Sequence, residues 1–422
     1  MHGNNQMRKR AVFLLSVSLL TAIALPMEVL SEERWPGWLG PNRDGWVSGF
    51  QSPATWPKEL KSVWELEVGT GYGSPLLEGD VVYQHARVGE DEVVWCVDLS
   101  NGKVLWRQSY PTPFTIGGGA ERHGKGPKSS PILADGQLFT FSITGVLSAW
   151  DSKTGKLLWQ KDHSDRFEKG HPYWGASASP IVDGDRVIVH FGTDGKGMLI
   201  AHDTKTGAEI WSQGDDGPSY SSPLVVEMAG IRQIIDWNQR TLAGVESETG
   251  RLLWEHPFPQ ANTDQNMPTP TFHDGVIILG AENRGLHLLE PRLENGQWSV
   301  LERWYQNQIA LDMASAVVND NQLYGLSHYS SGRLFCVDIA NGEILWQSGG
   351  RTGDNATFLA VPKYVIALID TGELQILKAA GKDTSVVASY EVSDKPTWSP
   401  PVLLDDGFLI KDQDTLTRWS FE

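Results

Sequence analysis

The sequence is poor in cysteine, in basic residues and in long apolar runs. Its 422 residues include only two cysteines, too few for a disulfide-built scaffold. The 35 Lys and Arg residues against 52 Asp and Glu give a formal net charge of −17. An acidic surface of this kind repels nucleic-acid phosphates, so no nucleic-acid partner is expected. Outside the N-terminus no stretch of helix length repeats its apolar residues every 3.6 positions, which excludes a helical bundle.

The one long apolar run lies at the N-terminus and predicts a secretory signal peptide. The charged "RKR" at 8–10 precedes "AVFLLSVSLLTAIAL" at 11–25, which is shorter than the roughly 20 residues that span a bilayer. We expect a signal peptide over 1–31, with an uncleaved membrane anchor as the alternative. The protein is then secreted or periplasmic, with no stable membrane span after cleavage.

Glycine, proline and tryptophan are plentiful, and many of them belong to a repeat. An acid, a Gly four residues later and a Trp eight residues later recur five times. The acid and the Trp of each copy are Asp98 and Trp106, Asp151 and Trp159, Asp203 and Trp211, Glu246 and Trp254, and Asp338 and Trp346. Weaker copies end at Trp304 and at Tyr390. We expect Gly to supply positive φ, the acid to accept backbone N–H groups, and the Trp to fill the gap between neighbouring sheets.

A second signature precedes each of these turns. A small hydroxyl residue, usually followed by Pro, stands at Ser74, Ser130, Ser179, Ser222, Thr269, Ser315 and Ser399. Four short strands in each unit of about 40–50 residues are typical of a β-propeller. We predict an all-β, eight-bladed propeller over 62–422 after a Trp/Pro-rich leader over 32–61. The last unit lacks its final strand, and we expect residues 62–68 to supply it. A seven-bladed ring is the alternative if the divergent unit at 354–392 is not a blade.

The two cysteines, Cys96 and Cys336, share one position of the repeat. Each stands two residues before the acid, Cys96 in the first unit and Cys336 in the sixth. Because two complete blades would separate them, we expect buried, unpaired thiols.

The turn resembles the pyrroloquinoline quinone (PQQ) repeat, whose hallmark is a D-x-x-T-G-x-x-x-W-like motif. The resemblance covers about 62–422 and implies a quinoprotein-like propeller. It leaves two functions open. One branch of the family holds quinone-dependent alcohol and sugar dehydrogenases, which use PQQ with Ca²⁺. The other holds non-catalytic propellers similar to the periplasmic subunit of the outer-membrane β-barrel assembly machine (BamB-like).

Two departures weigh against the dehydrogenase branch. The resemblance implies adjacent cysteines over the cofactor, and a Glu/Asn pair at Ca²⁺, and neither can be matched here. The histidines His123, His163 and His171 also lack a tight metal-ligand spacing. We therefore expect a monomeric, non-catalytic binding scaffold for a protein or glycan of the cell envelope, without metal or cofactor. A PQQ-dependent dehydrogenase with an atypical site is the alternative.

Two long connections between units, 110–128 and 161–177, are the candidate binding loops. The candidate residues at the channel mouth are Arg122, His123, Lys125, Lys128, His171, Tyr173, Trp174, Tyr220, Arg240 and Arg284. Further rim candidates are Tyr72, His163, Arg166, Asn266, Asp312, Asp354 and Trp398. Cations in an acidic chain can recognise a carboxylate, a sulfate or an acidic peptide, while aromatic rings stack on a sugar or a side chain. Alternatively, the loops only cap the channel and pair with Glu121, Asp162, Asp165 and Glu168.

Overall fold

The computed structural model describes Met1 and residues 34–261, 264–329 and 332–422. The chain divides into two compact units, Met1–Glu32 and Glu33–Glu422. The signal peptide expected over 1–31 lies outside the described residues, apart from Met1. In the described part of the chain no helix is long and apolar enough to cross a membrane.

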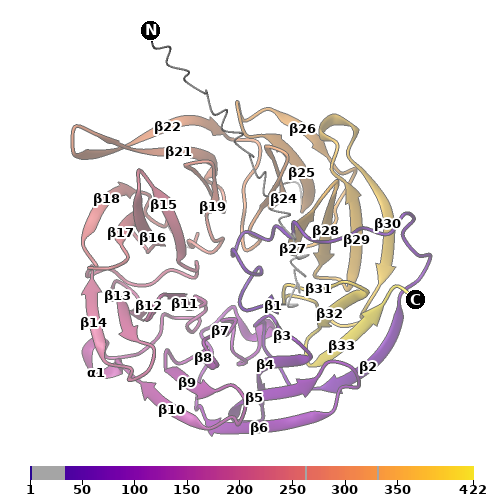
Figure 1. The fold of residues 1–422 in the computed structure, drawn as a ribbon, viewed down its shortest axis with the longest axis horizontal. Coiled ribbons are helices and arrows are strands. Elements are labelled where there is room, and N and C mark those ends of the chain that lie inside the picture. The colour runs from indigo at the N-terminus through magenta and orange to yellow at the C-terminus, as the bar shows by residue number, and fades with distance from the viewer. Residues whose placement is uncertain (2–33, 262–263, 330–331) are drawn as a thin grey trace. The chain divides into compact units, whose positions relative to one another are not determined.

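The second unit is a ring of eight antiparallel sheets, which confirms the predicted propeller (Figure 1). Blade 1 holds β3 (Leu76–Glu78), β4 (Val81–Val88), β5 (Asp91–Asp98) and β6 (Val104–Pro111). Blade 2 holds β7 (Ile132–Ala134), β8 (Gln137–Phe141), β9 (Leu147–Asp151) and β10 (Leu157–Lys161). Blade 3 holds β11 (Ile181–Asp183), β12 (Arg186–Thr193), β13 (Lys196–Asp203) and β14 (Glu209–Gln213). Blades 4 and 5 hold β15 (Leu224–Met228), β16 (Ile231–Trp237), β17 (Thr241–Glu246) and β18 (Leu252–Pro257); and β19 (Thr271–His273), β20 (Val276–Ala281), β21 (Gly285–Glu294) and β22 (Gln297–Gln306). Blades 6 and 7 hold β23 (Val317–Asn319), β24 (Gln322–Ser327), β25 (Arg333–Asp338) and β26 (Ile344–Gln347); and β27 (Ala356–Val361), β28 (Tyr364–Ile369), β29 (Glu373–Lys378) and β30 (Ser385–Glu391). Short helices α1 (Ser164–Phe167), η1 (Glu121–His123) and η2 (Gly381–Asp383) lie in connections.

The eighth blade joins the two ends of the propeller, as the sequence predicts. Strand β2 (Lys61–Glu67) pairs antiparallel with β33 (Thr415–Ser420), which continues to β32 (Gly407–Lys411) and β31 (Val402–Leu404). Leu66 faces Leu416 across this pair. The ring is therefore closed by backbone hydrogen bonds between the two ends of the propeller.

The repeated tryptophans connect neighbouring blades. The indole Nε1 of Trp64, Trp106, Trp159, Trp211 and Trp304 donates to a backbone carbonyl of the next blade, at 2.7–3.0 Å. In each case the acceptor is the residue that follows the repeat acid. Trp254 instead bonds Gln233 of its own blade, because the long β21–β22 hairpin of blade 5 has no acid-x-x-Thr-Gly turn.

A ring of hydroxyl side chains connects the inner ends of the blades. The backbone N–H of Ser74 donates to Ser130 Oγ, and the same bond links Ser130 to Ser179 and Ser179 to Ser222. Ser222 N–H donates to Thr269 and Thr269 N–H to Ser315. Ser399 Oγ donates to the carbonyl of Gly73, which joins the last blade to the first. We call these seven residues the hydroxyl ring. Blade 7 contributes none.

The leader packs against the propeller, which the sequence pattern did not predict. Trp35, Leu39, Phe50 and Trp56 are buried in the core shared by blades 1, 7 and 8. Strand β1 (Arg34–Trp35) pairs with β3 on the inner edge of blade 1. The chain then crosses the propeller axis to Ala360 of blade 7, whose N–H donates to Gly45 O. The leader has no repeat, so its contacts could not be assigned by register.

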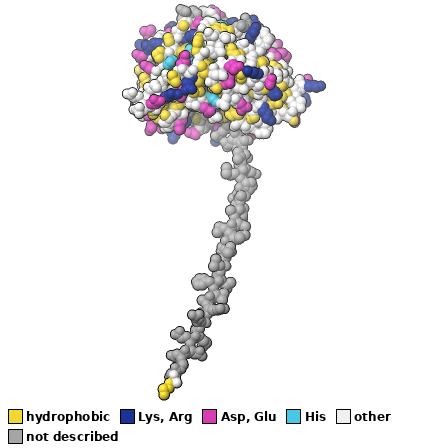
Figure 2. Space-filling view, turned by 90° about the horizontal axis from the view of Figure 1, so that it is seen from above, with side chains coloured by type: hydrophobic (Ala, Val, Ile, Leu, Met, Phe, Trp, Pro, Cys, Tyr) yellow, Lys and Arg dark blue, Asp and Glu magenta, His cyan; other side chains and the backbone are white. Residues whose placement is uncertain are grey.

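Both cysteines are buried and free. Cys96 lies on β5 and Cys336 on β25, five blades apart in chain order. On the face of the molecule seen in Figure 2, acidic and basic side chains are interspersed rather than gathered by sign.

Candidate functional site

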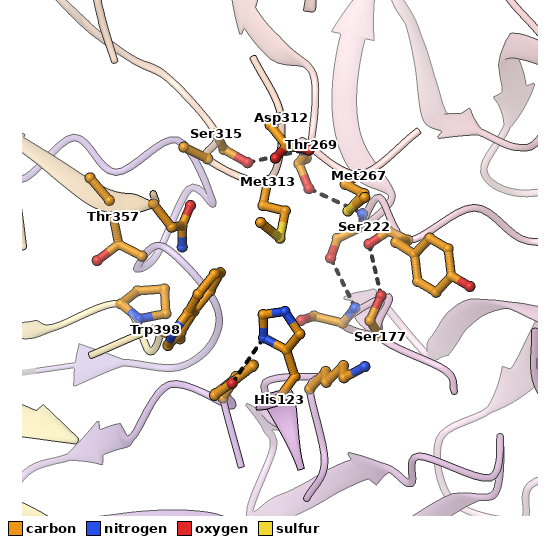
Figure 3. A pocket seen from close by; sticks show the side chains of 18 of the residues that line it. His123, Ser177, Ser222, Met267, Thr269, Asp312, Met313, Ser315, Thr357 and Trp398 are labelled. Atoms are coloured by element: carbon orange, nitrogen blue, oxygen red, sulfur yellow. Dashed lines mark hydrogen bonds between the residues drawn. The ribbon is translucent and has the colours of Figure 1, made fainter. Parts of the chain in front are cut away.

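A cavity of about 360 Å³ lies at the centre of the ring (Figure 3). Its wall follows the sequence repeat. In six blades, the residue two positions before the member of the hydroxyl ring lines the cavity. These six residues are Tyr72, Lys128, Ser177, Tyr220, Met267 and Met313. Trp38 and Leu39 of the leader line the cavity too, and they also line a second cavity of about 250 Å³. The leader therefore divides the central channel into two compartments.

Three rings from distant segments pack together at the edge of the main cavity. Tyr72 and Trp398 stack with centroids 5.4 Å apart, and the edge of His123 meets Trp398 at 4.8 Å. Arg122 Nε lies 3.2 Å from His123 Nε2 and donates to it, so the proton of the neutral imidazole is on Nδ1, 3.1 Å from the Tyr72 hydroxyl. Burial, with help from Arg122 and Lys128, lowers the pKa of His123 to about 4. His123 is therefore uncharged at neutral pH.

The cavity wall carries opposite charges on opposite sides. Arg122 and Lys128 lie in the connection between blades 1 and 2, whereas Glu282 and Asp312 belong to blades 5 and 6. In Figure 3 His123 and Asp312 lie on opposite sides of the cavity. Burial lowers the pKa of Lys128 to about 8 and raises the pKa values of Glu282 and Asp312. Desolvation thus disfavours the charged form on both sides.

The two long connections interlock above the cavity. Gly118 N–H donates to the Tyr173 hydroxyl at 2.9 Å, and Trp174 Nε1 donates to Gly118 O at 3.2 Å. Lys128 Nζ donates to Trp174 O at 2.8 Å. Gly117 permits this approach, since a Cβ there would lie 2.5 Å from the Tyr173 ring. We call the interlocked segments 112–128 and 162–177 the rim.

The structure brings some of the sequence-predicted residues to the cavity and leaves others away from it. Residues that line it are Tyr72, Arg122, His123, Lys128, Trp174, Tyr220, Asp312 and Trp398. Lys125 and Tyr173 belong to the rim but lie outside the cavity lining. Tyr173 is 54% exposed, and Lys125 lies 3.8 Å from Glu90. The rim therefore carries a charge and an aromatic ring that take no part in the cavity lining.

Three other candidates are held by local contacts. The His171 ring packs edge-on against Phe114, and its Nδ1 lies 2.8 Å from Pro172 O. Arg240 pairs with Asp215 and Asp216, at 2.7 and 2.8 Å. Arg284 donates to the carbonyls of Pro259 and Gln265. Arg240 and Arg284 thus tie a turn within a blade to an inter-blade connection, and His171 contacts the connection between blades 1 and 2.

The remaining rim candidates are also placed. His163 lies 3.0 Å from His202, and Arg166 pairs with Glu209 at 2.8 Å. Asn266 Nδ2 donates to the carbonyl of Asn238, and Asp354 pairs with Arg351. The acids Glu121 and Asp162 accept backbone N–H groups of their own loops, from Gly119 and Ser164.

Several residues that line the cavity were not predicted from the sequence. Met267 and Met313 occupy the same repeat register as Tyr72 and Lys128, so that register was the signal that could have found them. Glu282, Asn355 and Thr357 have no such signal, because Glu282 lies in the β20–β21 turn and the other two belong to the divergent unit at 354–392. Asn355 Oδ1 and Thr357 Oγ1 have no hydrogen-bond partner among the described residues.

The residues of the cavity do not match the PQQ and Ca²⁺ site that the family resemblance implies. The described residues include no group of three or more His, Cys, Asp and Glu side chains placed to hold a metal ion. Both cysteines lie on middle strands of blades and neither lines the cavity. We therefore derive no chemical step through PQQ.

The chain is similar to known proteins with two different functions, assembly factors and dehydrogenases. The chain is 23% identical to outer membrane protein assembly factor BamB of Yersinia pestis over 370 residues, covering 83% of this chain and 86% of that protein. It is 26% identical to the lanthanide-dependent methanol dehydrogenase of Methylacidiphilum fumariolicum, covering 50% of this chain but only 36% of the enzyme. The crystal structure of BamB from Moraxella catarrhalis aligns with a TM-score of 0.62 at 16% identity, covering 86% of this chain and 99% of that one.

A family model extends this likeness over more than half of the chain. It matches residues 90–348, a range that runs from blade 1 into blade 6, and its description is outer membrane protein assembly factor BamB. The repeat, the eight blades and this match agree, and the chain belongs to the family of PQQ-like repeat β-propellers described by that name.

Proposed function

We propose that this protein is a non-catalytic scaffold of the cell envelope that holds a partner protein at the rim of its propeller. The observation that carries the proposal is the interlocking of the two longest inter-blade loops into one rim that presents cationic and aromatic side chains. Rigid aromatic and cationic residues on a braced loop are the usual anchors of a protein interface.

The charge of the rim selects the partner. Within the rim the excess of positive charge lies in segment 112–128, where Arg122, Lys125 and Lys128 stand against one acid, Glu121, although the chain as a whole carries −17. Arg122 and Lys128 have no carboxylate within 4.0 Å among the described residues, so they are not committed to local ion pairs. An acidic segment of a partner protein would complement them.

The exposed aromatic residue of the rim supplies contact area. Tyr173 is 54% exposed, yet its hydroxyl is fixed by Gly118, and Trp174 packs at 5.9 Å beside it. Because these rings are already ordered, a partner would lose little conformational entropy in binding them. This supports a protein contact. A glycan stacked on the same rings is the other outcome that the experiment distinguishes.

Substitution of the rim cations tests the proposal. The double variant Arg122→Gln/Lys125→Gln should lose most of a crosslinked partner protein captured from the envelope fraction, relative to the unsubstituted chain. Lys153→Gln is the matched control, since Lys153 is an exposed cation in the outer turn of blade 2. Equal capture by the rim variant and the control would contradict the proposal. Loss of a glycan in place of a protein from the captured fraction would assign the rim to sugar.

The dehydrogenase alternative has its own decisive outcome. Addition of PQQ and Ca²⁺ to the purified protein should leave its absorbance spectrum unchanged and produce no dye-linked oxidation of alcohols or sugars. Stoichiometric PQQ binding with such oxidation would overturn the scaffold function.

A further inference from the structure

We propose that the central cavity binds a small zwitterion, with the ammonium and carboxylate groups of a short peptide whose two ends are free. The site shares Arg122, Lys128 and Trp174 with the rim but does not depend on a partner protein. Three features of the cavity carry the inference: a cationic side, an acidic side opposite to it, and an apolar zone between them.

The cationic side has unused donors. Lys128 Nζ donates to Trp174 O, which leaves two of its three N–H groups without a partner among the described residues. Arg122 donates through Nε to His123, and its terminal guanidinium nitrogens have no carboxylate within 4.0 Å in that part of the chain. A ligand carboxylate between Arg122 and Lys128 would receive charge-assisted hydrogen bonds. It would also relieve the cost of keeping Lys128 charged in a buried position.

The acidic side has unused acceptors. His328 lies 3.6 Å from Glu282 and 3.7 Å from Asp312, both beyond ordinary hydrogen-bond distance. No Lys or Arg pairs with either carboxylate in the described chain. Asn355 and Thr357 of the adjoining blade 7 add two oxygen atoms without donors. A ligand ammonium has three N–H groups and a positive charge, which match this set.

The order of the blades places these two sides opposite one another. Arg122 and Lys128 lie between blades 1 and 2, whereas Glu282 lies in the β20–β21 turn of blade 5 and Asp312 lies between blades 5 and 6. In a ring of eight blades these positions are half a turn apart. Met267 and Met313 lie within the remaining wall (Figure 3), and Trp38 and Leu39 of the leader also line the cavity. A ligand that reaches both charged sides must therefore cross an apolar zone.

Other ligand classes match the cavity less well. A polyanion would face Glu282 and Asp312, and a bare cation would face Arg122 and Lys128. A neutral sugar would leave both charged sides unpaired and partly desolvated, which is unfavourable. A molecule with both charges satisfies both sides at once.

Calorimetric titration with matched dipeptides tests the inference. The probes are L-alanyl-L-alanine, its N-acetyl derivative, which lacks the ammonium, and its C-terminal amide, which lacks the carboxylate. The free dipeptide should bind at pH 7 with a Kd below about 1 mM. Each blocked form should bind at least tenfold more weakly. Absence of binding by the free dipeptide, or equal binding by the three probes, would overturn the inference.

Variants assign the two ends of the ligand. Asp312→Asn should weaken the free dipeptide at least tenfold and remove its advantage over the N-acetyl form. Lys128→Met should also weaken binding of the free dipeptide at least tenfold, and it should remove the advantage of the free dipeptide over the C-terminal amide. Lys125→Gln, which changes a rim cation outside the cavity lining, should leave dipeptide binding unchanged. If Asp312→Asn does not fold, Glu282→Gln replaces it. Dipeptide binding that is insensitive to the cavity variants would place the ligand elsewhere and contradict the inference.

Discussion

The indole of Trp211 lies directly against Gly250 of the next blade, while its Nε1 donates to Ser247 O at 3.0 Å. A Cβ at Gly250 would lie 2.6 Å from Trp211 Cδ2, so the glycine has two tasks. It adopts φ +73° in the turn, and it leaves room for the neighbouring tryptophan. The repeat thus encodes contacts between blades as well as turns within them.

Gly250→Ala separates these two tasks when compared with Gly230→Ala. Both glycines lie in blade 4 at nearly equal positive φ, 73° and 72°, but nothing lies within 4 Å of a Cβ at Gly230. We expect Gly230→Ala to cost about 1–2 kcal/mol of unfolding free energy from backbone strain alone. Gly250→Ala should cost about 1–3 kcal/mol more, because the indole must move. Chemical denaturation measures the unfolding free energy of both variants. Equal losses would show that the contact between Trp211 and Gly250 contributes nothing to stability.

The hydroxyl ring predicts that Ser222→Ala lowers the unfolding free energy more than Ser222→Thr does. Ser222 Oγ accepts the N–H of Ser179 at 2.9 Å, and both residues are buried. Ser222→Ala leaves that N–H without an acceptor, which should cost about 1–3 kcal/mol. Ser222→Thr should cost less, since Thr269 fills the same role in the next blade. Denaturation midpoints give the comparison, and a harmless alanine variant would contradict the structural role of the ring.

Lys411 predicts a specific pH dependence of stability. Its buried Nζ donates to the carbonyls of Gly71, Asp412 and Gln413, and burial lowers its pKa from 10.5 to about 8. Between these pH values the unfolded chain binds more protons, so this residue makes folding more favourable as pH rises from about 8 to 10.5. The stability difference between the unsubstituted chain and Lys411→Met should therefore grow by about 2 kcal/mol from pH 7 to pH 10. A difference that is constant with pH would show that Lys411 stays charged when folded.

The leader predicts a stability contribution from outside the repeat. Trp56 is 9% exposed and packs edge-on against Tyr364 and Phe421, at 5.5 and 5.7 Å. Trp56→Ala should cost about 3–5 kcal/mol, as expected for a buried aromatic residue. Trp38 lies at the junction of the two channel compartments, so Trp38→Ala should instead enlarge the cavity. An unchanged unfolding free energy for Trp56→Ala would show that this contact of the leader does not stabilise the propeller.

The sequence predicted the propeller because its defining contacts recur at fixed spacing. Trp64, Trp106, Trp159 and Trp211 each reach one blade forward, so a single period describes them all. Closure by residues 62–68 followed from counting strands, and β2 lies at Lys61–Glu67. The leader has no period, and its crossing of the axis depends on tertiary contacts that spacing cannot encode.

The cavity was only partly predictable for the same reason. Tyr72, Lys128 and Tyr220 lie in the repeat register that faces the axis, and loop length drew attention to Arg122 and Trp174. Glu282 and Asn355 lie at the divergent ends of strands in blades 5 and 7. Their charges and unpaired oxygens become meaningful only when the ring places them opposite the rim loops.

Site-specific photocrosslinking tests the proposed role of the rim most directly. A benzoylphenylalanine replaces Tyr173 in one variant and Tyr305 in another, two tyrosines that are 54% and 51% exposed on the rim and on the outer strand β22. We predict that irradiation in the intact envelope crosslinks a partner protein from position 173 and not from position 305. A partner crosslinked only from position 305 would place the interface on the blade edges and contradict the account.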